Sequence, residues 1–73
     1  MTDKTALERM TVNLIPKAAE ALGTAAAREG LSKTDTVNRA LQLYDYVTGL
    51  TAAGAEVLIR TPGSAELTSL KLL

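Results

Sequence analysis

Polar and apolar residues alternate strictly from Arg9 to Leu14 in this 73-residue chain. Successive side chains of a strand point to opposite faces, so the alternation predicts a strand over residues 9–15. One face would carry Arg9, Thr11 and Asn13, and the other would carry Met10, Val12 and Leu14. An ordinary half-buried strand shows the same alternation, so the pattern alone leaves open what the polar face contacts.

Helical spacing replaces the alternation after this strand. The alanine-rich stretch Pro16–Glu29 predicts a first helix, because proline is tolerated in a first turn and Gly30 suits a C-terminal cap. Its core stripe would consist of Ala18, Ala19, Leu22, Ala25 and Ala26.

A second helix is predicted from Ser32, the expected N-cap, with Asp35 placed to reach back as in a capping box. Its apolar residues form two stripes, one with Val37, Leu41, Tyr44 and Thr48, and the other with Ala40, Leu43 and Val47. Two stripes indicate burial on two sides, as in an intertwined dimer. We expect this helix to run to about Ala53 and to end at Gly54.

The tail is predicted to form strand, turn and strand. Glu56–Arg60 and Ala65–Leu72 flank Thr61–Ser64, which has strong turn chemistry. A type II turn matches hairpin twist poorly, so the loop is expected to exceed two residues. The tail is apolar enough to pack on the rest of the protein, and we expect it beside the ends of the second helices, away from the first strand.

Small size and a thin supply of core residues predict association. The chain has no phenylalanine or tryptophan and only two tyrosines, so it can bury little surface alone. With neither cysteine nor histidine, it lacks disulfides and zinc-type ligand clusters, and it contains no evident nucleophile–base pair. We therefore expect an obligate homodimer that is not an enzyme and uses no cofactor or metal.

The balance between basic and acidic residues limits the kinds of partner that the chain is expected to bind. Eight basic residues offset eight acidic ones, which argues against a nonspecific polycation, so nucleic-acid binding would need a locally arranged face. The N-terminus has no signal-peptide pattern, and no apolar run approaches membrane-spanning length. We expect a cytoplasmic protein without a membrane partner.

Three segments at characteristic separations carry a family resemblance. They are Arg9-Met10-Thr11-Val12-Asn13-Leu14, Gly30-Leu31-Ser32-Lys33-Thr34 and Asn38-Arg39-Ala40-Leu41-Gln42-Leu43-Tyr44. Over about residues 9–48 the chain resembles the ribbon-helix-helix transcription factors, the MetJ/Arc/CopG-like family. The resemblance implies an α+β fold, a β-α-α homodimer, here with a C-terminal β-hairpin extension. The implied division is a flexible arm at 1–8, the ribbon-helix-helix domain at 9–53 and the hairpin at 54–73.

The resemblance also implies double-stranded DNA as the partner. Two chains would pair their strands as an antiparallel ribbon in the major groove, with Arg9, Thr11 and Asn13 reading bases. Ser32, Lys33 and Thr34 would bind a phosphate at the start of the second helix. Each residue has an ordinary alternative: the first three can be a solvated strand face, Ser32 can serve only as a cap, and Lys33 only as a turn residue.

The chain departs from the family pattern in two respects. It lacks a basic surplus, so few phosphate contacts are expected, and dimers on adjacent half-sites would restore affinity. Ile15-Pro16 also replaces a polar cap before the first helix.

Three functions fit these features. The first is a sequence-specific regulator of transcription, acting as a repressor. The second is an antitoxin that binds operator DNA and holds a toxin protein with its tail, and the third is a dimerisation module. Antitoxin tails are often polar segments that fold on their partner. The apolar tail of this chain favours the regulator.

Overall fold

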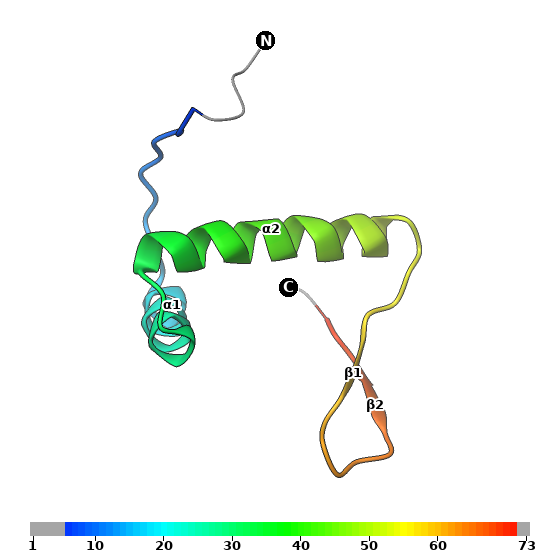
Figure 1. The fold of residues 1–73 in the computed structure, drawn as a ribbon. Helices are drawn as coiled ribbons and strands as arrows, with labels where there is room; N and C mark the ends of the chain where they lie inside the picture. The colour runs from blue at the N-terminus through cyan, green and yellow to red at the C-terminus, as the bar shows by residue number, and fades with distance from the viewer. Residues whose placement is uncertain (1–5, 72–73) are drawn as a thin grey trace.

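A computed structural model describes residues 6–71 of the chain and contains two helices followed by two short strands. The elements are α1 (Pro16–Glu29), α2 (Lys33–Ala52), β1 (Leu58–Arg60) and β2 (Leu67–Ser69), as Figure 1 shows. The fold is thus a small α+β arrangement. Residues 1–5, most of the expected N-terminal arm, and residues 72–73 lie outside the described part.

The expected strand over residues 9–15 does not form, and this prediction is wrong for the single chain. Residues 7–15 are neither helix nor strand, so the order of elements is α-α-β rather than β-α-α. A strand requires hydrogen bonds to a neighbouring strand. The sheet contains only β1 and β2 among the described residues, so the chain offers residues 9–15 no such neighbour.

Helix α1 confirms the predicted bounds at both ends. Proline occupies its first turn, and Ile15 precedes it without a side-chain cap. At the C-terminal end Gly30 has φ 66°, a left-handed conformation that glycine adopts without strain. Its geometry lets the Leu31 N–H donate to the Ala26 carbonyl at 2.9 Å, which satisfies an otherwise unpaired helix carbonyl.

Helix α2 begins at Lys33 and has Ser32 as its N-cap, as predicted. The Asp35 N–H donates to the Ser32 Oγ at 3.0 Å, which is the N-cap hydrogen bond. The helix ends at Ala52, with Ala53 as its C-cap and Gly54 at φ 93° beginning the tail. A helix of 20 residues is about 30 Å long, and it separates the segment before α1 from the hairpin (Figure 1).

The expected tail hairpin is present. Strands β1 and β2 pair antiparallel, with Leu58 opposite Ser69, Ile59 opposite Thr68 and Arg60 opposite Leu67. The connection spans residues 61–66 and is therefore longer than two residues, as predicted. After β2 the chain returns toward α2, where Leu70 lies beside Tyr44 and Val47.

The core within one chain is very small. Among the described residues only Ala26 and Val47 are buried, at 6% and 9% exposure. The two stripes of α2 were expected to be covered, yet Leu41, Leu43 and Tyr44 remain more than half exposed. The surface area is 7030 Å², whereas a compact chain of 7.7 kDa exposes about 4300 Å².

The shape agrees with this shortage of buried surface. The radius of gyration is 15.4 Å, against about 11 Å for a compact chain of this length. Helix α1 contacts α2, and β1 contacts β2, but the strands do not pack on either helix. Among the described residues no further element covers the apolar sides that this leaves open. Local hydrogen bonds therefore define the elements more than tertiary packing does.

No helix in residues 6–71 combines the length and the apolar character needed to cross a bilayer.

The N-cap of α2 offers a direct test of local stability. We predict that Ser32→Ala lowers the free energy of unfolding by about 1 kcal/mol, because the Asp35 N–H loses its acceptor. Urea unfolding at fixed protein concentration measures the change. The neighbouring Thr34→Ala is the control, since its hydroxyl forms no hydrogen bond within the described chain. Equal losses in both variants would contradict the capping role.

Candidate nucleic-acid interface

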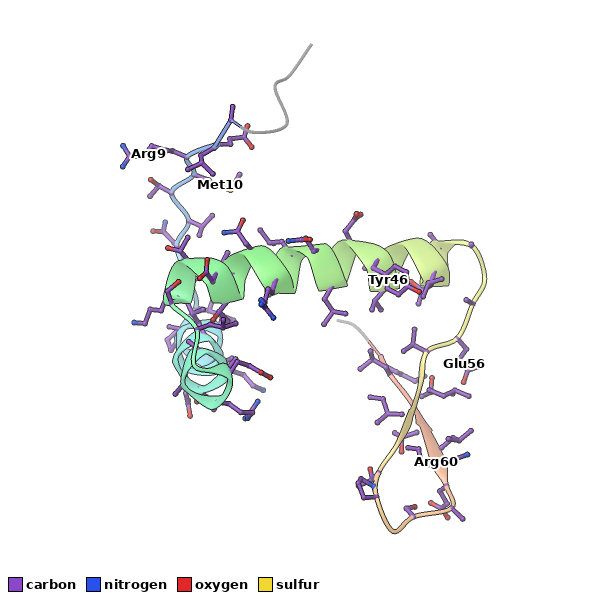
Figure 2. The ribbon with its side chains drawn as sticks, in the orientation of Figure 1. Arg9, Met10, Tyr46, Glu56 and Arg60 are labelled. Atoms are coloured by element: carbon purple, nitrogen blue, oxygen red, sulfur yellow. The ribbon has the colours of Figure 1, made fainter. Side chains whose placement is uncertain are left out.

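The segment that precedes α1 carries the proposed base-reading residues. Arg9, Thr11 and Asn13 are all exposed, and Figure 2 shows Arg9 on the stretch that leads away from the helices. The apolar residues between them are exposed too, with Met10 at 76%, Val12 at 60% and Leu14 at 45%. Exposure on this apolar side decreases toward α1, yet all three apolar side chains remain exposed.

The start of α2 carries the proposed phosphate-binding residues. Ser32, Lys33 and Thr34 are exposed. The Ser32 Oγ already accepts the Asp35 N–H, and the Ser32 carbonyl accepts the Thr36 N–H at 3.0 Å. Ser32 is therefore a cap in any case, and a ligand role would be additional.

Free backbone donors remain at this helix start. The N–H groups of Lys33 and Thr34 have no hydrogen-bond partner within the described chain. Such donors, together with the helix dipole, favour an anion. Asp35 lies in the same first turn, and its negative charge partly cancels the positive end of the helix dipole. It therefore weakens the attraction of this helix start for an anion.

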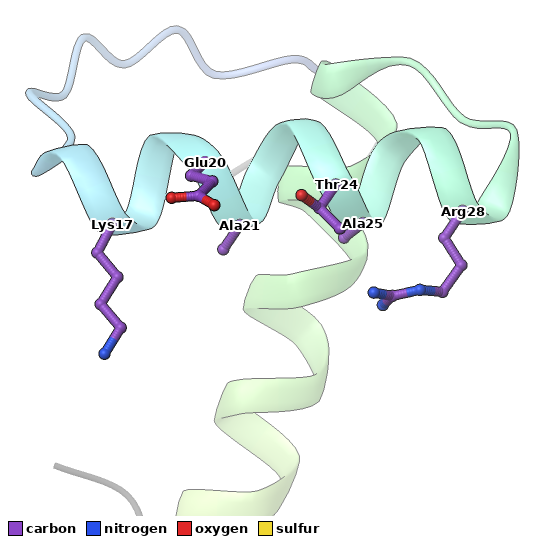
Figure 3. A pocket seen from close by; sticks show the side chains of 6 residues that line it. All are labelled: Lys17, Glu20, Ala21, Thr24, Ala25 and Arg28. Carbon is purple, nitrogen blue, oxygen red and sulfur yellow. The ribbon is translucent and has the colours of Figure 1, made fainter.

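These two groups of residues lie toward the same end of the molecule. Figures 1 and 3 both show the segment before α1 passing near the N-terminal end of α2, while Figure 1 places the hairpin at the opposite end. The segment before α1 and the start of α2, which carry the candidate residues, thus lie toward one end of the molecule. The fold does not order Arg9, Thr11 and Asn13 into a strand face, because residues 7–15 lack a partner strand.

A shallow depression of about 430 Å³ follows one face of α1. Figure 3 shows its lining residues, Lys17, Glu20, Ala21, Thr24, Ala25 and Arg28. All six belong to a single helix, so the depression is an open helix face that small side chains make hollow. Its floor of Ala21 and Ala25 permits close approach of another element and supplies no ligand chemistry.

Sequence patterns did not single out Tyr46 or the edge of β1. Tyr46 lies on neither predicted stripe of α2 and is 66% exposed. The alternation of apolar residues does not reveal which edge of β1 is unpaired. The opposite charges of Glu56 and Arg60, on either side of Leu58, are the sequence feature that could have indicated it. Within residues 6–71, no three acidic, histidine or cysteine side chains are grouped so that they could hold a metal ion.

Comparisons of the chain with protein-family models, with curated proteins and with solved structures found no match. A functional proposal therefore depends on the residues themselves and on the region in which the fold places them.

Proposed function

We propose that this chain is the subunit of a homodimeric, sequence-specific DNA-binding regulator of transcription, a repressor of the ribbon-helix-helix type. The observation that carries the proposal is residues 9–15, an uncovered segment beside the start of α2 that alternates polar and apolar side chains. Such a segment has no strand partner among the described residues and resembles a reading ribbon in its alternation. A second copy would supply the missing strand.

Unburied surface supports the dimer. The chain exposes roughly 2700 Å² more than a compact chain of its mass, and a standard interface removes about 800 Å² from each partner. Met10, Val12 and Leu14 would meet their counterparts beneath the ribbon. The open stripes of α2 would pack between the two subunits.

The polar face supports DNA reading in this arrangement. Once Val12 and its apolar neighbours turn inward, Thr11 and its polar neighbours must turn outward, because adjacent side chains of a strand point in opposite directions. Arg9 can grip guanine, and Asn13 can form two hydrogen bonds with adenine. Thr11 can contact a thymine methyl or exchange hydrogen bonds with a base edge.

The neutral charge determines how binding would be achieved. Phosphate contacts would come from the Lys33 ammonium and from the free N–H groups of Lys33 and Thr34. So few contacts give modest affinity for one site. Dimers bound to adjacent half-sites would raise the affinity through their high local concentration.

The tail supports the regulator over the antitoxin. The hairpin forms its own hydrogen-bonded register, and Leu70 lines a depression together with residues of α2. A segment that folds on its own chain does not need a toxin to order it.

Two adjacent substitutions test the dimer and the assignment of faces. We predict that Val12→Asp abolishes pairing of residues 9–15 between two copies and so lowers association of the chain, because it places a charge beneath the ribbon. Thr11→Asp should leave the dimer intact and abolish DNA binding, because its carboxylate would face the phosphates and base edges. Sedimentation at micromolar concentration and gel shifts measure the two effects. A folded monomer of the unmodified chain, or a Val12→Asp variant that associates as strongly as Thr11→Asp, would contradict the arrangement.

DNA binding itself is tested by gel shift with the DNA upstream of the protein's own gene. We predict that Arg9→Ala and Asn13→Ala weaken specific binding by about 1–3 kcal/mol and relax base preference. Lys33→Ala should weaken binding to all sequences and flatten its salt dependence. The control is Lys17→Ala, which removes the same charge from α1.

Binding by all three variants that equals binding by the parent protein would refute the site. Absence of any shift with the upstream DNA, followed by failure to select a sequence from random duplexes, would refute the function.

A further inference from the structure

The outer edge of β1 presents unpaired backbone groups. The Leu70 N–H donates to the Val57 carbonyl at 2.8 Å, so these residues form a hydrogen-bonded pair. In an antiparallel ladder hydrogen-bonded pairs alternate with pairs that are not bonded. Ile59 and Thr68 therefore form the next bonded pair, and the N–H and carbonyl groups of Leu58 point away from β2.

The same alternation turns the backbone groups of Glu56 and Arg60 outward. The sheet has two strands among the described residues, so no third strand meets these groups. An open edge of this kind is a template for another strand. Charged residues on an edge usually discourage such pairing. On the edge of β1, however, the positions of Glu56 and Arg60 favour pairing with an identical strand.

The charges on this edge are self-complementary. Two identical strands that pair antiparallel about a two-fold axis place one residue opposite itself. With Leu58 at the axis, Glu56 lies opposite Arg60 of the partner subunit, and Val57 lies opposite Ile59 of the partner subunit. Like apolar residues and opposite charges thus meet along the whole edge.

The edge of β2 lacks this property. Its charged residues, Glu66 and Lys71, are separated by an odd number of positions, so no two-fold register sets one opposite the other. Glu56 and Arg60 are separated by an even number and are centred on Leu58. Of the two strands, β1 is therefore the one whose charges can face each other in a two-fold pairing.

The faces of the hairpin fit the same arrangement. Val57, Ile59 and Leu70 share one face, and Leu70 lines a depression together with residues of α2. Ile59 remains 45% exposed, and pairing would extend this apolar face across both hairpins. On the other face Leu58, 47% exposed, would meet Leu58 of the partner subunit between two ion pairs. Figure 2 shows the Glu56 and Arg60 side chains on the same side of the hairpin.

We propose that β1 pairs edge to edge with β1 of a second copy of this chain, centred on Leu58, to form a four-stranded antiparallel sheet in the order β2-β1-β1-β2. This interface is separate from residues 9–15 and does not rest on DNA binding.

Cysteine substitution tests the register, because the natural chain contains no cysteine. Facing residues of a hydrogen-bonded pair have Cα atoms about 5.5 Å apart, within the range of a disulfide. The full-length Leu58→Cys variant should form a covalent dimer under mild oxidation. Ile59→Cys, similarly exposed, should form little, because its two copies are offset diagonally by about 7–8 Å. Absence of the Leu58→Cys dimer, or equal rates in both variants, overturns the proposal.

Charge reversal tests the complementarity. Glu56→Lys or Arg60→Glu, each added to Leu58→Cys, should slow cross-linking about 3- to 10-fold, because like charges then face each other. Mixing the two double variants should restore the rate and yield mainly the mixed dimer, which mass spectrometry identifies. Glu56 and Arg60 of one strand lie about 13 Å apart, so contacts within one chain cannot produce this rescue. A mixture that reacts no faster than its components contradicts the pairing.

Amide hydrogen exchange tests the unmodified chain without any substitution. Paired edges should protect the Leu58 and Arg60 N–H groups as strongly as the Ile59 N–H, which the hairpin itself protects. Fast exchange at Leu58 and Arg60 at a concentration where the protein is associated overturns the proposal. The outcome is separable from the proposed function, because Arg9→Ala should weaken specific DNA binding and leave both the exchange and the cross-linking unchanged.

Discussion

Burial of apolar surface constrains this protein more than any other interaction, because the described chain encloses only Ala26 and Val47. Hydrogen bonds at Ser32, Gly30 and Val57 define where helices and strands begin and end. They do not close a core. Side chains such as Leu43 and Tyr44 therefore remain exposed until another surface covers them. Association with a second copy is the simplest source of that surface for a chain this small.

This constraint links dimerisation to the proposed DNA binding. Residues 9–15 alternate in character, so burial of Val12 in a subunit interface leaves Thr11 facing outward. One strand would thereby supply both the dimer contact and the reading face. The start of α2 lies in the same region, where its free N–H groups would meet a phosphate beside the groove. The neutral overall charge would make this local arrangement essential for the proposed binding, since no general attraction to DNA would assist it.

The hairpin places a second self-complementary segment at the far end of α2. Both proposed interfaces join identical strands about a two-fold axis, and they differ in what selects the register. Residues 9–15 would be aligned by their apolar side chains beneath the ribbon. The edge of β1 would be aligned by Glu56 and Arg60 on either side of Leu58.

The sequence by itself determined the features that depend on near neighbours in the chain. Pro16, Gly30 and Ser32 predicted the helix bounds closely, because capping and turn chemistry act over a few residues. Alternation singled out Arg9, Thr11 and Asn13, yet the strand they were expected to form is absent from the single chain. A strand depends on hydrogen bonds to a segment that local sequence does not supply. For the same reason, only the paired register of β1 and β2 decided which backbone groups remain open at Leu58, and hence where a second copy can add.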